Sequence, residues 1–553
     1  MQNEYFYKCE KNAELEFGTG FDISPSVNTG RYLVSNVKES NAEIFAPEIN
    51  QYCERSVDSL DLKMSNLKKL YEARAVVYES AQDVDSSVRV GQTVLVVSDS
   101  NQSELMESLN VRGFSAIHIL SNVVSGFTGF LGNFTLKSKR EEGGATLSAD
   151  QVLWFNAPAQ IAKLIGVYDP ERDGVDETIR QLETHQGIFT YRNTIKYNGS
   201  ICLQKNKREE ICGRCIDACA EKAMFRDLEK QRIELSNIQC IGCGRCVSVC
   251  PTGALDYSPM PRSSFDSVSS LYKDSIALVI AERSEIHDIP PKLPSKVLPF
   301  IVENCGFLDE DYLLSLIHTT RHPVLIYSSE LSQHQKDGID FINDIFRKIY
   351  NVPGVYVCSN TEQISEVSKI IVPFQVDFTQ GVEEDLSKRQ RVSSRLFSMV
   401  ADGNFGVIST GANIPFGTVA INENKCTLCL SCVDACTVGA LVPNTEDNSL
   451  RCTQSLCVQC GHCETTCPET DCLSVMYNEF ELASFYFLPQ IMAKDKIFNC
   501  VECGKGFAPS KSIAKIIQLM TPKFGDDSMR IKSLSCCPDC KAKVMLEVIG
   551  TGI

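Results

Sequence analysis

The sequence lacks any continuous run of about eighteen apolar residues, the length that a helix needs to cross a bilayer. We therefore expect no transmembrane segment. The N-terminal stretch is polar and acidic and has neither the regions of a secretory signal nor a twin arginine, which predicts a cytoplasmic protein. Positive charge is also in deficit, because 54 Lys and Arg face 70 Asp and Glu, for a formal net charge of −16. Without a basic stripe we expect no nucleic-acid partner, and the acidic balance suits either simple solubility or docking on a basic protein surface.

The chain also lacks the short motifs of several enzyme classes: there is no GxGxxG fingerprint, no P-loop and no nucleophile elbow. Residues 90–100 predict a buried strand, residues 103–110 a helix and residues 113–120 a second strand, as in a βαβ unit. A glycine-rich stretch at 126–134 predicts a loop, which either cradles a ligand or forms a surface turn. A flavin or nucleotide site in residues 90–160 stays open, without a claim of dinucleotide binding.

Cysteine is scarce at first and abundant later. The first 200 residues hold only Cys9 and Cys53, whereas most of the 27 cysteines bunch into residues 202–250, 426–472 and 500–540. A secreted disulfide framework is usually a short chain with its cysteines spread throughout. The bunching therefore predicts metal sites in a reducing compartment.

The second cysteine block, within residues 418–478, contains the spacing C-x2-C-x2-C-x3-C twice. Three closely spaced thiolates can hold one face of a cubane cluster, whereas the fourth lies on the following helix and points to another cluster. We therefore predict that each cluster takes three cysteines from one set and the fourth from the other set. The predicted ligands are Cys426, Cys429, Cys432 and Cys467 for one [4Fe-4S] cluster, and Cys457, Cys460, Cys463 and Cys436 for the other.

The first cysteine block, within residues 196–258, repeats this plan with one distortion. Its later set is complete, whereas its earlier set has Glu209 where the leading cysteine is expected. Cys202 is the nearest substitute, separated by an inserted loop, and without it the site could hold a three-iron cluster or leave one iron open. The predicted ligands are Cys202, Cys212, Cys215 and Cys250 for one cluster, and Cys240, Cys243, Cys246 and Cys219 for the other.

Both blocks resemble bacterial dicluster ferredoxins in their triple cysteine spacing and in the Cys–Pro pair that ends each later set. The resemblance implies two ferredoxin-like modules with four [4Fe-4S] clusters. Thr437 and Ala220 stand where this family usually has proline after the last cysteine of the earlier sets. The alternative, two zinc-binding repeats, is disfavoured because zinc sites seldom use this spacing. Cys452 and Cys472 flank the second block, either as spare ligands or as small buried side chains.

A third group of cysteines lies near the C-terminus, in two C-x2-C pairs about thirty residues apart, which predicts a zinc ribbon. A closed site of four thiolates leaves no position for a substrate, so we expect a structural role. Cys536 is predicted to be a bystander. Iron is the alternative metal, because Gly504 and Pro538 also resemble rubredoxin. The predicted ligands are Cys500, Cys503, Cys537 and Cys540.

Residues 275–375 alternate predicted strands, at 275–282, 322–329 and 353–359, with predicted helices at 309–320 and 338–350. This alternation indicates a small parallel sheet after a linker at 258–264. The stretches VENCGFLDEDYLL (302–314), HPVLIYSS and PGVYVCS resemble the delta subunit of hydrogenase–heterodisulfide reductase complexes. Such subunits pass electrons through a [2Fe-2S] cluster, which needs four cysteines. This region offers only Cys305 and Cys358, so the resemblance implies a retained fold and docking role with the cluster lost. A generic α/β core explains the pattern as well.

These patterns predict an α+β multidomain chain with two dicluster modules, small α/β parallel-sheet domains and a C-terminal zinc ribbon. Helical spacing is also present at residues 56–81, and a helix is expected within residues 380–405. The expected divisions are a mixed region at 1–85, an α/β domain at 86–195, the first module at 196–260, an α/β domain at 270–378, the second module at 415–480 and the zinc domain at 490–553.

The resemblances imply an iron–sulfur electron-transfer protein, more a subunit of an oxidoreductase complex than a stand-alone enzyme, with no catalytic residue of its own. It is expected to relay electrons between a cytoplasmic oxidoreductase, such as a formate dehydrogenase or a hydrogenase, and another acceptor. The oligomeric state stays open. Two alternatives remain: an oxidoreductase subunit with its own flavin or nucleotide site, and a scaffold in which the clusters only hold the fold together.

Overall fold

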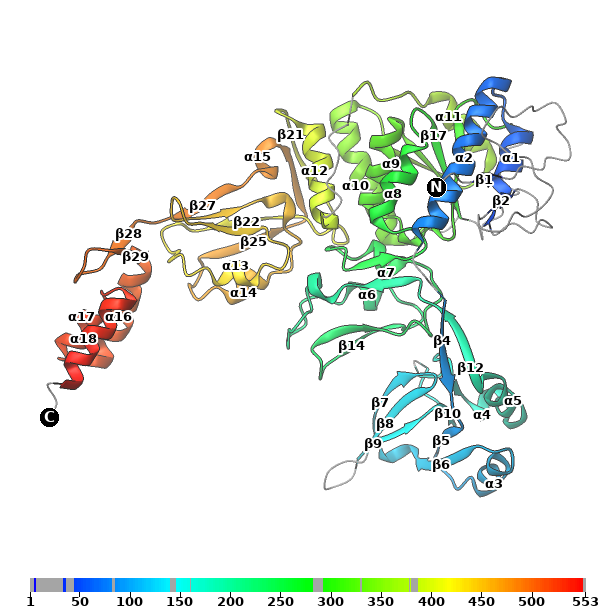
Figure 1. Cartoon of the computed structure of the whole chain (residues 1–553), viewed down its shortest axis with the longest axis horizontal. Coiled ribbons are helices and arrows are strands. Elements are labelled where there is room, and N and C mark those ends of the chain that lie inside the picture. Colours follow the sequence, from blue (N-terminus) through cyan, green and yellow to red (C-terminus); the bar gives the residue numbers. More distant parts are fainter. Residues whose placement is uncertain are drawn as a thin grey trace. The chain divides into compact units, whose positions relative to one another are not determined.

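A computed structural model gives the fold of the chain, which divides into two compact units (Figure 1). The first unit comprises Met1–Ser200, Gln204–Gln335 and Val355–Asp377, and the second comprises Ile201–Leu203, Lys336–Gly354 and Phe378–Ile553. Cys9 and most of the predicted mixed region before residue 44 lie outside the described residues. The residues that the structure describes are 4–5, 33–35, 44–81, 85–139, 146–159, 161–281, 292–328, 331–376, 378 and 386–550.

The first unit contains a parallel sheet in the order β11-β10-β5-β6. The strand, helix and strand predicted at 90–120 are confirmed, and α3 and α5 pack Leu109 and Leu182 against Val94 and Val96 in one apolar core. The strands and helices are β5 (Thr93–Ser98), α3 (Ser103–Val111), β6 (Ser115–Leu120), β10 (Gln151–Trp154), β11 (Val167–Tyr168), α4 (Pro170–Asp173) and α5 (Val175–His185).

The glycine-rich stretch predicted as a loop at 126–134 is instead a β-hairpin, so that prediction is wrong. Gly129 has a φ of 110°, and a Cβ atom there would overlap the carbonyl oxygen of Asn133, so glycine is needed for the tight pairing. Phe127 stacks on Phe134 at 5.3 Å and meets Trp154 edge-on at 5.4 Å, which ties the hairpin to the core. The antiparallel strands are β7 (Val124–Phe130), β8 (Asn133–Ser138) and β9 (Thr146–Ala149).

The first cysteine block is enclosed by short antiparallel strand pairs. Its first and last strands, β13 and β16, pair with each other, so the segment between them returns to its starting point. A long ribbon, β4 with β12, leads into the block from the parallel sheet. The elements are β4 (Asp85–Val90), β12 (Gly187–Arg192), β13 (Ile195–Tyr197), α6 (Arg214–Asp217), β14 (Met224–Asp227), β15 (Arg232–Leu235), α7 (Arg245–Ser248) and β16 (Leu255–Tyr257).

A second parallel sheet follows, in the order β18-β17-β19-β20. Three of its strands and the helix at 309–320 were predicted and are confirmed, whereas β18 was not predicted. Every residue of β17 and β18 is buried. The elements are β17 (Ile276–Ala281), β18 (Val297–Val302), η4 (Cys305–Phe307), α9 (Glu310–Thr320), β19 (Val324–Tyr327), α10 (Gln333–Tyr350), β20 (Val355–Cys358) and α11 (Thr361–Ile370).

The prediction of a linker at 258–264 is wrong, because residues 258–262 are buried and helix α8 (Arg262–Ser270) begins within the stretch. The guanidinium of Arg262 forms ion pairs with Asp309 and Asp311 in the interior. It also lies 4.5 Å from the centre of the Tyr312 ring. Polar and proline residues here serve a buried ion pair and a helix start rather than a flexible joint, so the first block and the second sheet belong to one packed body.

Two N-terminal helices complete the described part of the first unit. The helical spacing predicted at 56–81 is confirmed by α2, which buries Leu67, Leu70 and Tyr71 and packs on α8. The elements are β1 (Glu4–Tyr5), β2 (Leu33–Ser35), β3 (Ile44–Phe45), α1 (Pro47–Arg55) and α2 (Leu60–Ser80).

The second unit contains most of α10, from Lys336, and α12 (Lys388–Val400), which confirms the helix predicted within 380–405. A capping box between Ser387 and Gln390 starts this helix. The second cysteine block is again closed by its outer strands, because β22 pairs with β25. The elements are β21 (Asn404–Ser409), β22 (Gly417–Ile421), α13 (Ser431–Ala435), β23 (Leu441–Asn444), β24 (Ser449–Cys452), α14 (His462–Thr466), β25 (Leu473–Tyr477), β26 (Glu479–Ala483), α15 (Ser484–Phe487) and β27 (Gln490–Lys494).

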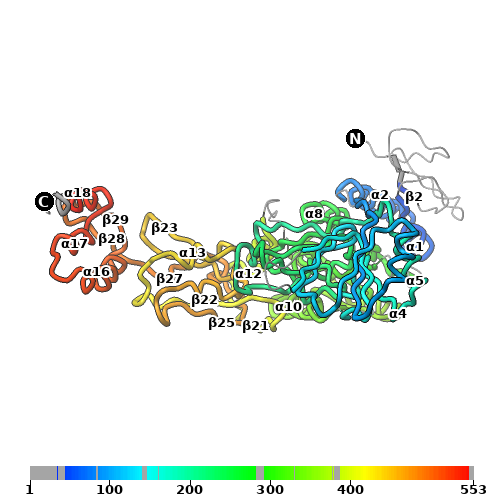
Figure 2. Tube along the Cα trace, turned by 90° about the horizontal axis from the view of Figure 1, so that it is seen from below, coloured from blue at the N-terminus to red at the C-terminus, as the bar shows by residue number. Residues whose placement is uncertain are grey.

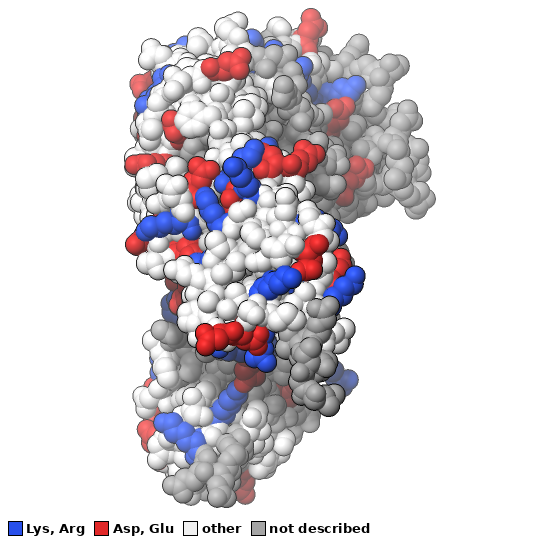
Figure 3. Space-filling view, turned by 90° about the vertical axis from the view of Figure 1, so that its left-hand side faces the viewer, with Lys and Arg blue, Asp and Glu red and all other residues white. Residues whose placement is uncertain are grey.

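The C-terminal segment forms a β-hairpin and three helices that gather together, as Figure 2 shows. None of the helices in the described ranges has the length and apolar character needed to span a membrane. On the face drawn in Figure 3, Lys and Arg are interspersed with Asp and Glu, and neither sign forms a continuous stripe. The C-terminal elements are β28 (Ile497–Asn499), β29 (Gly506–Pro509), α16 (Ser510–Phe524), α17 (Ser528–Ser533) and α18 (Pro538–Gly550).

Candidate metal centres

Cysteines from both sets of the first block line one cavity. Its volume is about 330 Å³, and its wall contains three cysteines of the later set together with the last cysteine of the earlier set. Helix α6 contacts α7, and Cys219 lies two residues after the end of α6. The fold therefore brings together the four residues predicted to share one cluster. They are Cys219, Cys240, Cys243 and Cys246.

Backbone donors surround the sulfur atoms of this cavity. The Ala223 N–H donates to the Sγ of Cys219 at 3.2 Å, and the Gly242 N–H donates to the Sγ of Cys240 at 3.4 Å. Gly242 and Gly244 both have positive φ, at 69° and 75°, which lets the loop wrap around the cavity with its amides pointing inward. Amides directed at sulfur stabilise thiolate over thiol, as ligands of iron require.

The electrostatics of this cysteine group also fit a metal cluster. Burial raises the pKa of the Cys246 thiol well above its ordinary value, and nearby charge on Cys240 raises it further. Burial likewise raises the pKa of Cys240. Four thiolates this close together repel one another unless a cation lies between them. The cavity and its donors therefore suit a group that supplies positive iron to four thiolates.

The other predicted ligand set of the first block is brought together only in part. Cys212 and Cys215 precede and enter α6, and Cys250 follows α7 with its Sγ 3.7 Å from the Thr252 hydroxyl. All three belong to the first compact unit. Cys202 belongs to the short segment Ile201–Leu203, which groups with the second unit, so its role as the missing ligand stays a prediction.

In the second block, a narrower space of about 20 Å³ is lined by one predicted ligand set and by Cys472. Burial raises the pKa of the Cys432 thiol to about 12, with the charge of Cys426 as the next cause. The predicted ligands in this wall are Cys426, Cys429, Cys432 and Cys467.

In the remaining predicted set of the second block, the charges of neighbouring cysteines affect the pKa of Cys463. Burial raises the pKa of the Cys463 thiol to about 12, and charge on Cys457 and Cys460 adds to this rise. Charge on Cys436 contributes as well, although Cys436 belongs to the earlier set. Cys452 is fully buried in the same apolar cluster, as expected for a small side chain beside the site.

Both blocks match family models described as a 4Fe-4S dicluster domain, over residues 210–255 and 418–468. The chain carries two 4Fe-4S dicluster domains. The first match contains seven of the eight predicted ligands of its block and begins after Cys202, whereas the second contains all eight. These domains identify the chain as an iron–sulfur protein of the electron-transfer type.

A further similarity links the chain to a curated enzyme. A segment of 44 residues is 41% identical to the archaeal-type glutamate synthase (NADPH) of Dehalococcoides mccartyi. The segment covers 8% of this chain and 9% of that protein. The similarity is thus local, and it concerns a small part of an oxidoreductase.

Beyond the dicluster domains, four cysteines converge near the C-terminus, with their sulfur atoms all within 4.8 Å of one another. Although burial opposes it, backbone N–H groups, led by that of Cys537, lower the pKa of Cys500 to about 6. The first pair lies on the β28–β29 hairpin, whereas the second pair lies at the start of α18. The residues brought together are the predicted set, Cys500, Cys503, Cys537 and Cys540.

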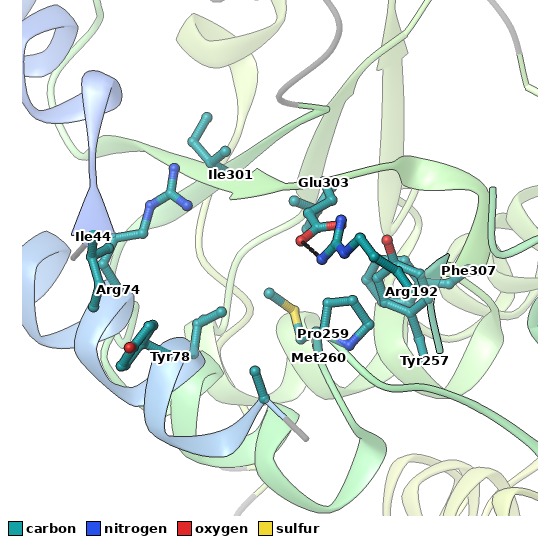
Figure 4. A pocket seen from close by; sticks show the side chains of 13 residues that line it. Ile44, Arg74, Tyr78, Arg192, Tyr257, Pro259, Met260, Ile301, Glu303 and Phe307 are labelled. Atoms are coloured by element: carbon teal, nitrogen blue, oxygen red, sulfur yellow. Dashed lines mark hydrogen bonds and ion pairs between the residues drawn. The ribbon is translucent and has the colours of Figure 1, made fainter. Parts of the chain in front are cut away.

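The first unit also contains an apolar pocket of about 270 Å³ between α2, β16 and β18 (Figure 4). Tyr78, Met260 and Ile301 are among the side chains in its wall. Arg192 pairs with Glu303 at 3.0 Å, so the two charges at one side of the pocket compensate each other. This pocket lies outside residues 90–160, where a flavin or nucleotide site was considered.

Sequence reasoning missed two residues around the first cavity. The Thr194 hydroxyl lies 3.7 Å from the Sγ of Cys240, and Asn304 lines the cavity from outside the dicluster domain. Asn304 lies in the VENCGF stretch, residues 302–307, directly after β18 and the neighbouring Glu303. No local pattern connects it with the cysteines, because it lines their cavity only when η4 packs on α7.

Proposed function

We propose that this chain relays electrons between redox partner proteins through four [4Fe-4S] clusters, two in each dicluster domain. The observation that carries the proposal is the shared cavity of Cys219 and Cys240, in which the fourth cysteine of one motif meets the three cysteines of the other motif. When bound, such a group supplies reversible one-electron transfer. The chain contributes the thiolates, the N–H donors to sulfur and the apolar packing that keeps water away.

The proposed ligands follow the crossed plan in both domains. Residues Cys202, Cys212, Cys215 and Cys250 hold one group, and Cys240, Cys243, Cys246 and Cys219 hold the next. In the second domain, Cys426, Cys429, Cys432 and Cys467 hold the third group, and Cys457, Cys460, Cys463 and Cys436 the fourth. The C-terminal four-cysteine site is proposed to hold a structural zinc ion, since its thiolates form a closed set.

The proposed partners are cytoplasmic oxidoreductases, with a formate dehydrogenase or a hydrogenase as the class of donor. The α/β domain at 270–378 is proposed as a docking element, in keeping with its resemblance to a hydrogenase-associated subunit. The glutamate synthase similarity favours a place in a larger oxidoreductase. An oxidoreductase subunit with its own flavin site is the second candidate, and bound flavin in the purified protein would support it.

Anaerobic reconstitution followed by metal analysis tests the proposal. We expect about sixteen iron atoms and about one zinc per chain, with reversible reduction at low potential. Iron that settles near eight atoms, or a colourless protein, would contradict four clusters.

Single ligand variants test the crossed plan. We expect Cys219→Ser and Cys240→Ser to alter the same component of the electron paramagnetic resonance (EPR) spectrum of the reduced protein. Cys215→Ser, although close to Cys219 in sequence, should alter a different component. If Cys219→Ser and Cys215→Ser change the same component, each motif holds its own cluster and the crossed plan is wrong.

A further inference from the structure

Asn304 lies in the wall of the cavity formed by Cys219, Cys240, Cys243 and Cys246. It is not part of the dicluster domain, whose match ends at residue 255. The residue follows β18, so it reaches the cavity from the neighbouring α/β sheet. A polar residue from a different part of the fold therefore lines the same cavity as four cysteines of the first dicluster domain.

Contacts on both sides fix the backbone of Asn304. Its neighbour Glu303 forms a two-pronged ion pair with Arg192, at 3.0 and 3.2 Å (Figure 4). On the other side, three residues after Asn304, the ring of Phe307 stacks on that of Tyr257 with ring centres 4.4 Å apart and planes within 5°. These anchors leave residue 304 little freedom to move away from the cavity.

Close backbone packing holds the same segment against the cysteine loop. A Cβ atom on Gly244 would lie 2.7 Å from the backbone nitrogen of Phe307, so the loop between Cys243 and Cys246 touches η4 directly. The side chain of Gln335, a residue of the same unit, donates to the carbonyl oxygen of Cys305 at 2.7 Å. The approach needs glycine in the loop, and it brings Asn304 beside the sulfur ligands.

The hydrogen bonds of Asn304 set which end of its amide is free for the cavity. Its Oδ1 accepts the backbone N–H of Gly306 at 2.7 Å. Because the N–H group of Gly306 can only donate, the Oδ1 end of the amide faces it, and the NH2 group occupies the other end. Asn304 therefore carries two N–H donors at the cavity wall.

We propose that Asn304 donates an N–H hydrogen bond to sulfur of the [4Fe-4S] cluster held by Cys219, Cys240, Cys243 and Cys246, and thereby raises its reduction potential. Reduction adds negative charge to the cluster and its sulfur ligands, and a donor aimed at sulfur stabilises that charge. The inference rests on the proposed function. In this proposal the α/β domain not only packs beside the first dicluster domain but also adjusts the reduction potential of one of its clusters.

The test compares Asn304→Ser with Asn304→Leu in the full-length, anaerobically reconstituted protein. Serine keeps an oxygen that can cap Gly306 but carries no amide donor that extends as far, whereas leucine removes both functions. Asn360→Ser is the matched control, because Asn360 caps α11 through Gln363 at 2.9 Å without lining the cavity. Each protein is titrated with dithionite while its EPR spectrum is recorded.

We expect one of the midpoint potentials to fall in both Asn304 variants and to stay at the wild-type value in Asn360→Ser. The component that shifts should be the one that Cys240→Ser alters. If the wild-type protein binds no cluster, the proposed function fails. If clusters are present and Asn304→Ser leaves every midpoint unchanged, or shifts a different component, the function stands and the role of Asn304 is overturned.

Discussion

Gly306 lies directly against the carbonyl oxygen of Cys243, and a Cβ atom at position 306 would overlap that oxygen. This contact joins η4 to the cysteine loop, and it leaves no room for the smallest side chain. The α/β domain and the first dicluster domain thus meet at the backbone of a predicted iron ligand. Substitutions in the α/β domain are therefore expected to affect the metal site even when no cysteine is replaced.

Gly306→Ala should therefore loosen the cysteine loop and lower the iron content. We expect the variant to lose up to about four iron atoms per chain, one cubane, because η4 must move away from Cys243. Iron and protein are measured after anaerobic gel filtration. Gly338→Ala is the control, since a Cβ there meets only Ile414 at 3.6 Å. Equal iron content in both variants would show that the contact does not support the site.

Arg262→Met should destabilise the first unit strongly. The buried carboxylates of Asp309 and Asp311 would lose their partner, and an uncompensated buried charge typically costs about 3–5 kcal/mol. The measurement is resistance to proteolysis in increasing urea. Arg112→Gln, which breaks an exposed pair with Glu183, should cost less than about 1 kcal/mol. A similar urea dependence for the two variants would refute the buried-pair argument.

Cys202→Ser tests the least regular ligand of the first dicluster domain. We expect the variant to show the EPR signal of an oxidised three-iron cluster, because one corner of a cubane loses its thiolate. Cys358→Ser is the control, as Cys358 is buried at the end of β20 and belongs to no predicted set. A variant with the wild-type spectrum would mean that another group holds that iron.

Zinc binding at the C-terminal site should weaken as the pH falls. The pKa of Cys540 is raised to about 12, first by its hydrogen bond with Cys503, so the metal must displace a proton from this thiol. If each zinc ion displaces at least one proton, a fall from about pH 8 to about pH 6.5 raises the Kd for zinc at least about thirtyfold. A chromogenic chelator reports the release. Affinity that does not change over this range, or that survives in Cys540→Ser, contradicts the assignment.

Local patterns in the sequence were enough to predict most helices and the cysteine sets, because ligand spacing and helical periodicity involve neighbouring residues. The strand β18 escaped prediction because Pro299 lies in its middle, and proline argues against a central strand. The structure places β18 at the edge of its sheet, where a missing N–H is tolerated. Edge position is a property of the assembled sheet, so the sequence of this strand does not reveal it.

The contrast between local patterns and long-range packing also explains which parts of the metal site could be predicted. The crossed grouping of Cys219 with Cys240 follows from motif spacing, whereas the place of Asn304 depends on a contact between residues about sixty positions apart. The supposed linker at 258–264 was misleading for a related reason. Its polar residues suggest exposure, but the partners that bury Arg262 lie on a later helix.

The segment η4 is synthesised after the cysteine loop that it covers. The ribosome releases Cys243 before it has made Gly306 and Phe307, so the loop exists for a time without its cover. Only after translation has passed Phe307 can η4 pack over the loop between Cys243 and Cys246.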